Sequence, residues 1–154
     1  MMSSILPSVE VPNFETENRT ALPSKTYSID IDTGDIKGKI DGLEAVKQAI
    51  LKIINTGRFK HPIYSYNYGC EIHDLIGMDL TNGFLMAELE RMIKEAVEYD
   101  DRVDTVHSFN ITTNEDNIYI SFQVDTVEGE LTINEVINRV WGAVLWKYFR
   151  ENVK

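Results

Sequence analysis

The chain has 154 residues, 43% of them hydrophobic and 10% aromatic, which suits one globular domain with a core of its own. Fifteen basic and twenty-five acidic residues give a net charge of -10, and this excess of acid argues against nucleic acid or an anionic membrane as a main partner. The single cysteine excludes an intramolecular disulfide, and no apolar run reaches the length of a signal peptide or a membrane span. We therefore expect a soluble protein that is made and kept in a cytoplasm.

Residues 1–25 are predicted to form an extended N-terminal arm. Pro7, Pro12 and Pro23 interrupt this segment, and its polar composition leaves too little apolar surface for it to fold alone. Its apolar residues are nevertheless more numerous than a purely solvating tail needs. Two interpretations stay open, a disordered terminus and an arm that becomes ordered on a partner.

A β-hairpin is predicted to open the ordered domain, which we place at residues 26–133. Apolar and polar residues alternate over 27–31 and again over 36–40, which is the period of a half-buried strand. Thr33 and Gly34, between the two runs, favour a turn that joins the strands as a hairpin.

An amphipathic helix is predicted to follow the hairpin. Asp41 has the position of an N-cap and Glu44 completes a capping box, in which Asp41 accepts a hydrogen bond from the backbone near Glu44. Apolar residues then recur at helical spacing, and Gly57 stands where a helix C-cap is expected. The helix should therefore end near Thr56.

The connection formed by residues 56–70 is rich in aromatic side chains. Tyr64, Tyr66 and Tyr68 alternate as in an extended segment, which would present phenol rings along one face. Connecting loops are usually hydrated and mobile, so a loop with this many aromatic side chains is unusual and needs a structural or functional explanation. One interpretation is a loop tucked against the domain, with its tyrosines filling gaps. The other is a rigid docking surface for another protein.

The second half of the chain is predicted to contain helices, then strands, then a final helix. Grouping of strands apart from helices favours an α+β fold, in which a small antiparallel or mixed sheet packs against two to three helices. The expected elements are a short helix over 71–77, a longer helix capped by Thr81 or Asn82, strands over 106–113, 118–127 and 130–133, and a C-terminal helix within residues 134–154.

The sequence carries no phosphate-binding glycine loop, nucleophile elbow or pair of cysteines. Cys70 and His73 could share a helix face as metal ligands, but a lone cysteine is more often a small buried hydrophobe. Glu71 and Asp74 could form a glycosidase pair, although acids are so abundant here that the pairing says little. We therefore expect no catalytic residues, no metal and no cofactor. The only cluster of residues that the sequence offers for catalysis or metal binding is His61, Cys70, Glu71, His73 and Asp74.

Four blocks of the sequence resemble a known protein family. Residues 27–34, 40–50, 63–69 and 74–77 are together similar to the sheath initiator of contractile phage tails, a baseplate wedge protein long labelled lysozyme-like. The resemblance is to the branch found in prophages and phage-tail-like bacteriocins of Gram-positive bacteria. It covers roughly residues 26–133, and the blocks are specific as a set rather than singly.

The resemblance implies a structural role at the baseplate. Proteins of this family have the fold of the sheath protein's assembly domain, and their sheet edges accept strands from the first sheath ring. The implied partners are the sheath protein, the wedge proteins of the core bundle, the inner tube or tube-initiator protein, and neighbouring copies in a six-fold ring. The implied location is the bacterial host cytoplasm during assembly, and then the baseplate of the released particle.

The resemblance also indicates where a partner would be held. The wider family carries a Glu-Pro-Arg type motif after the first helix, and residues 56–59 stand at that place here. Arg58 matches the arginine of the motif, whereas the acid is missing and Phe59 replaces part of the signature. The candidate partner-binding residues are therefore Arg58, Phe59, Tyr64, Tyr66 and Tyr68.

Two other classes of function stay open. One is a cell-wall hydrolase, because relatives carry the lysozyme-like label and Glu71 and Asp74 could supply its carboxylates. The other is an adaptor module that binds a peptide strand. The predicted strands fit any partner that adds a strand, since an open sheet edge presents unpaired N–H and C=O groups.

Overall fold

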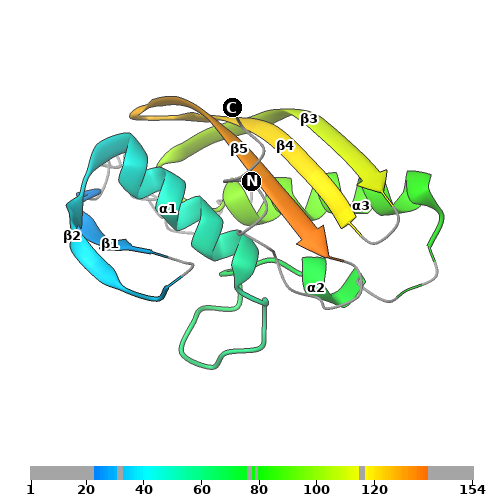
Figure 1. The fold of residues 1–154 in the computed structure, drawn as a ribbon, viewed down its shortest axis with the longest axis horizontal. Coiled ribbons are helices and arrows are strands. Elements are labelled where there is room, and N and C mark those ends of the chain that lie inside the picture. The colour runs from blue at the N-terminus through cyan, green and yellow to red at the C-terminus, as the bar shows by residue number, and fades with distance from the viewer. Residues whose placement is uncertain (1–22, 31–32, 76–77, 79, 115–116, 139–154) are drawn as a thin grey trace, which may run out of the picture.

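Two antiparallel sheets and three helices form the part of the chain described by a computed structural model, namely residues 23–30, 33–75, 78, 80–114 and 117–138 (Figure 1). The helices precede a run of three consecutive strands, and this arrangement confirms the α+β fold expected from the sequence. The elements are β1 (Thr26–Ile29), β2 (Ile36–Ile40), α1 (Gly42–Asn55), α2 (Ile72–Leu75), α3 (Asn82–Val97), β3 (Val103–Asn114), β4 (Asn117–Thr126) and β5 (Gly129–Asn138).

The main core lies between the three-stranded sheet and the helices. β4 is the central strand, and α3 contacts β3 while α1 contacts β5. Every second residue of β4 is buried, as its alternating pattern predicts, and the Phe122 ring stacks on Phe109 at 5.3 Å between centroids. The helices contribute residues at helical spacing, namely Val46, Ile50 and Ile54 from α1 and Leu85, Leu89, Ile93 and Val97 from α3.

α1 begins and ends where the sequence predicts. The Asp41 side chain accepts a hydrogen bond from the N–H of Gly42 at 2.9 Å, so the predicted N-cap residue is confirmed. The expected capping box is wrong in its detail, because the bonded N–H belongs to the next residue and not to the backbone near Glu44. The C-cap is Thr56, so the helix ends where expected, but the cap residue is one position before the glycine that the sequence indicated.

A buried glutamine fastens the β1–β2 hairpin to α1. Gln48 is 7% exposed, accepts a hydrogen bond from the N–H of Ile29 at 2.8 Å and donates one to the C=O of Tyr27 at 2.9 Å. A neighbouring strand would make the same two bonds to alternate residues of β1. The outer edge of β1 is therefore occupied by a side chain, and β2 carries the open edge of the described hairpin.

α3 starts after Thr81, one of its two predicted caps. Phe84 shares the helical spacing of the apolar residues in this helix, which predicts that it is buried with them, but it is 53% exposed. The buried stripe begins one residue later, at Leu85, and continues four residues further at Leu89. Phe84 lies in the first turn beside that stripe and so projects away from the core.

The predicted C-terminal helix does not begin at residue 134. Residues 134–138 continue β5, and Val136 and Ile137 are both buried. Two adjacent apolar residues fit either a helix stripe or a strand buried on both faces, and pairing with β4 decides for the strand. Residues 139–154 of that helix, and residues 1–22 of the predicted arm, lie outside the described residues.

Candidate docking surface and strand edges

The connection between α1 and α2 is a closed loop. The N–H of Cys70 donates to the C=O of Thr56 at 2.8 Å, and the N–H of Arg58 donates to the C=O of Cys70 at 3.2 Å. A short parallel bridge between Gly57 and Cys70 results. Residues 56–70, called the aromatic loop below, therefore leave and re-enter the domain at one point near the end of α1 (Figure 1).

Gly69 makes this closure possible. Its φ is +101°, in the region that favours glycine, and a Cβ on it would lie 2.6 Å from the carbonyl oxygen of Thr56. Backbone atoms of Thr56 and Arg58, on the opposite limb of the loop, occupy that space, so no side chain can be accommodated without opening the loop.

Arg58 lies at the base of the aromatic loop, with its side chain only 10% exposed. Its Nε donates to the C=O of Gly69 at 3.2 Å, and its Nη1 lies 3.3 Å from Glu71 Oε1 and 2.7 Å from Glu95 Oε1. The hydrogen bond from Arg58 lowers the pKa of Glu95 below its usual value. The acid of the family motif is missing directly before Arg58, and the carboxylates come instead from Glu71, on the far side of the loop, and from Glu95 on α3.

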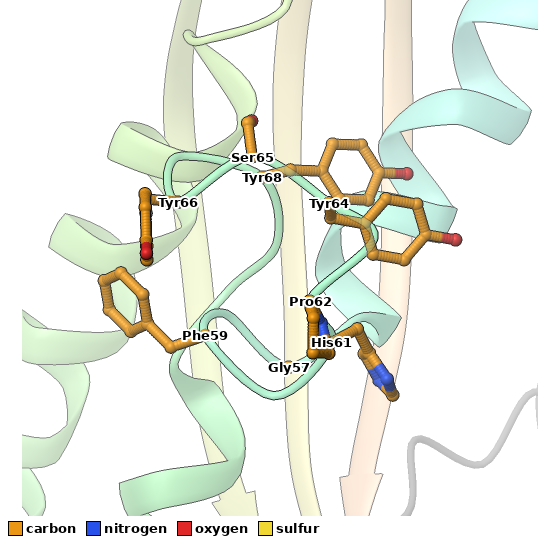
Figure 2. A pocket seen from close by; sticks show the side chains of 8 residues that line it. All are labelled: Gly57, Phe59, His61, Pro62, Tyr64, Ser65, Tyr66 and Tyr68. Carbon is orange, nitrogen blue, oxygen red and sulfur yellow. The ribbon is translucent and has the colours of Figure 1, made fainter.

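The tyrosines do not form the extended row that the sequence predicted. Turns closed by hydrogen bonds from Tyr64 N–H to His61 C=O, and from Tyr68 N–H to Ser65 C=O, bend the chain. The rings separate into two pairs, because Tyr64 and Tyr68 lie 4.6 Å apart while Phe59 and Tyr66 lie 6.3 Å apart between centroids. Figure 2 shows these pairs on opposite sides of the loop.

The aromatic loop presents its rings to solvent around a cavity of about 210 Å³. Phe59 is 66% exposed, Tyr66 82% and Ile63 87%, which is a large apolar exposure for one short segment. Tyr68 is the exception, since it packs against the core and burial raises its pKa. Of the five predicted partner-binding residues, the structure thus exposes Phe59, Tyr64 and Tyr66, and it places Arg58 and Tyr68 beneath them.

The predicted chemical cluster is not assembled. Cys70 belongs to the core, its Sγ lies 3.7 Å from the C=O of Met92, and burial raises its pKa to about 11, so the thiol stays protonated. Glu71 pairs with Arg58, and Asp74 pairs with Lys60 at 2.9 Å. Within the described residues, no group of three or more His, Cys, Asp and Glu side chains could hold a metal ion.

A row of hydrogen-bonded side chains, formed by Ser108, His107 and Asp125, was not predicted from the sequence. His107 Nδ1 lies 2.8 Å from Ser108 Oγ, and its Nε2 lies 3.1 Å from Asp125 Oδ2. In a serine hydrolase the aspartate of such a row is buried, whereas the His107 and Asp125 side chains here are 40% and 43% exposed. Ser108 has a φ of 57° at the bulge of β3, so we interpret the row as support for that bulge.

Three strand edges are open within the described part of the chain, those of β2, β3 and β5. β4 is paired on both sides, so of the strands predicted over 118–127 and 130–133 only the second, which is part of β5, has an open edge. The register of β3 shifts between His107 and Asn110, and such a bulge interrupts an edge. β5 pairs with β4 without a shift from Gly129 to Asn138 and so has the most regular edge.

The fold and these surfaces define an assembly module, built from sheet edges and an exposed loop. The family described as the contractile injection system sheath initiator matches residues 22–129, and the chain belongs to that family. It is also 38% identical over 136 residues to the phage-like element PBSX protein XkdS of Bacillus subtilis (strain 168), covering 87% of this chain and 96% of that protein.

These findings confirm the resemblance stated from the sequence, including its Gram-positive prophage branch. The chain is thus a structural component of a contractile tail, with a role in starting the sheath. None of the helices in the described ranges is both long enough and apolar enough to cross a membrane.

Proposed function

We propose that six copies of this chain form a ring around the inner tube at the baseplate, and that each accepts a strand of the sheath protein at an open sheet edge. The ring links the wedge proteins to the first sheath ring and contacts the inner tube or its initiator. It is assembled in the bacterial host cytoplasm and stays in the baseplate of the released particle. Membership of the sheath initiator family supports this role.

The regular edge of β5 is the observation that carries the proposal. Thr126 and Gly129 flank a two-residue turn, and the pair beside such a turn exchanges hydrogen bonds, after which bonded and non-bonded pairs alternate. Thr132 and Asn134 therefore fall on non-bonded pairs, so their N–H and C=O groups point away from β4. Their side chains are exposed, and a partner strand can pair with this backbone without displacing core residues.

The β2 edge is the second candidate. Since the C=O of Tyr27 bonds to Gln48, the pair of Tyr27 with Lys39 is also a non-bonded one, and the backbone of Lys39 points outward. Every residue from Ile36 to Lys39 is exposed, so this edge offers backbone with little side-chain burial.

Single prolines test both edges. Thr132→Pro, Asn134→Pro and Lys39→Pro each remove one outward N–H, whereas alanine at the same positions keeps it and serves as the matched control. Each variant replaces the wild-type copy in a producing strain, and particles are counted by electron microscopy. At the true edge, proline should yield tubes and baseplates without sheath, while alanine gives sheathed particles. Full-length sheath in every folded proline variant would exclude strand addition at these edges.

We further propose that the aromatic loop docks on the wedge proteins. Phe59 and Tyr66 carry the contact, because exposed aromatic rings that become buried at an interface often contribute about 2 kcal/mol or more each. Phe59→Ser and Tyr66→Ser should therefore reduce incorporation into baseplates without affecting folding. Phe84→Ser removes a ring of similar exposure from α3 and should leave incorporation unchanged. Equal incorporation of all three variants would mean that the loop is not the docking surface.

We also propose that the chain is not an enzyme and acts without a cofactor, a metal or nucleic acid. Both carboxylates of the suggested hydrolase pair are engaged in ion pairs, Glu71 with Arg58 and Asp74 with Lys60. The hydrolase alternative would require at least one of them to be released for acid–base chemistry.

A further inference from the structure

The aromatic loop combines exposed side chains with a strained backbone. Phe59 has a φ of 64°, a left-handed conformation that is uncommon for a residue with a bulky side chain. Such a conformation persists only where neighbouring contacts hold it. Phe59 is 66% exposed, so burial of its own ring cannot supply most of that support.

The contacts that can hold it belong to the preceding residue. Arg58 bonds to the carbonyl of Gly69 on the returning limb of the loop and to Glu95 on α3, at 3.2 Å and 2.7 Å. One guanidinium therefore joins both limbs of the loop to a helix whose core face is buried. Charge-assisted hydrogen bonds of this kind are among the stronger ones in proteins.

Glu95 is shared with a second arginine, which provides an internal comparison. Arg91 Nη1 lies 3.0 Å from Glu95 Oε2, and Arg91 Nε lies 2.6 Å from Glu88 Oε2. Arg91 is 54% exposed and all of these partners lie on α3, so its contacts do not reach the loop. Arg58 alone of the two connects Glu95 to the aromatic loop.

We infer that Arg58 and Glu95 are positioning residues that hold the aromatic loop in one orientation on α3. Arg58 therefore serves the docking surface from beneath and does not contact the partner. A loop held in this way has already lost the conformational freedom that docking would otherwise remove, which favours binding. This inference rests on the docking role proposed above.

Hydrogen–deuterium exchange of the full-length protein tests the inference. In Arg58→Ala, amides of residues 56–70 should exchange at least about tenfold faster, while the β-sheet stays protected. Glu95→Gln should give a smaller increase in the same segment. Arg58→Lys keeps the charge near Glu95 but lacks the planar fork that also reaches Gly69, and should lie between wild type and Arg58→Ala. Arg91→Ala should leave the loop unchanged.

The outcomes separate this inference from the docking proposal. Unchanged exchange over residues 56–70 in both Arg58→Ala and Glu95→Gln would overturn the positioning role, whatever the Phe59 and Tyr66 variants do. Faster exchange together with normal incorporation into baseplates would support the positioning role of Arg58 and Glu95 but would show that docking does not depend on it. If Arg58→Ala fails to fold, exchange in Glu95→Gln becomes the test of the positioning role. This variant should fold, because the Glu95 side chain is 53% exposed and water can hydrate the glutamine amide.

Discussion

Replacing Glu135 by glutamine should remove a pH dependence from the stability of this domain. Glu135 stands opposite Ile120 on the core-facing side of β5, is 4% exposed, and has an Oε1 atom without a hydrogen-bond partner in the described structure. Burial raises its pKa to about 7, and the positive charge of Lys47 offsets only part of this effect. The folded state therefore favours the protonated, neutral form of the side chain.

The sign and size of the pH dependence of the unfolding free energy follow from this pKa. An unfolded chain loses the proton near 4.5, whereas the folded chain keeps it until about 7, so the folded state binds more protons between these values. The free energy of unfolding should accordingly fall as the pH rises through that window and then level off. The two pKa values differ by about 2.5 (7 minus 4.5), and since a difference of one in pKa corresponds to about 1.4 kcal/mol, the full loss amounts to about 3–4 kcal/mol.

Urea denaturation of both proteins at about pH 5 and about pH 8 measures the effect. Other groups titrate over the same range, so the useful quantity is the difference in unfolding free energy between Glu135→Gln and wild type. That difference should favour the variant by up to about 3 kcal/mol more at the higher pH. A difference that is the same at both pH values would show that Glu135 does not titrate as a buried group, and would refute the reasoning.

Two further predictions concern the loop closure and the absence of catalysis. Gly69→Ala should destabilise the domain by roughly 2 kcal/mol or more in urea denaturation. The control Gly83→Ala lies in α3 with open space around it and should be neutral or stabilising. Equal effects of the two substitutions would mean that the bridge tolerates a side chain at Gly69. The purified protein should not degrade cell-wall substrate, and a measurable rate that disappears in Glu71→Gln or Ser108→Ala would establish a hydrolase.

Local pattern alone determined most of the secondary structure. The boundaries of α1 and the alternating burial of β4 were predicted, because the period of apolar residues records which face of a helix or strand is buried. The hairpin was predicted as well, but the half-buried face expected for its strands was wrong, since Tyr27 is 58% and Ile36 68% exposed. Caps and turns add their own signals, as Asp41 and Thr33-Gly34 show. The resemblance to sheath initiators was likewise visible in short sequence blocks, and with it the class of function.

Pairing between distant segments decided what the pattern left ambiguous. Val136 and Ile137 suit a helix stripe as well as a buried strand, and only their partners on β4 distinguish the two. The tyrosines of the aromatic loop have the spacing of a strand, yet hydrogen bonds between Thr56, Arg58 and Cys70 join the two ends of the segment, and turns at Tyr64 and Tyr68 bend it in between. A periodicity carries no information about bonds that join the two ends of a loop.

The functional surfaces depended most on tertiary structure. The partner-binding role of Arg58 stays a prediction, and nothing in the sequence indicated its acceptors within the chain, which lie 11, 13 and 37 residues away and come together only when the loop returns to α3. Which strand edges are open was equally undecided, because an edge is defined by the neighbours a strand lacks. The sequence by itself determined most of the strands and helices, whereas only the assembled sheets, and Gln48 beside β1, determined that the open edges of the described residues are those of β2, β3 and β5.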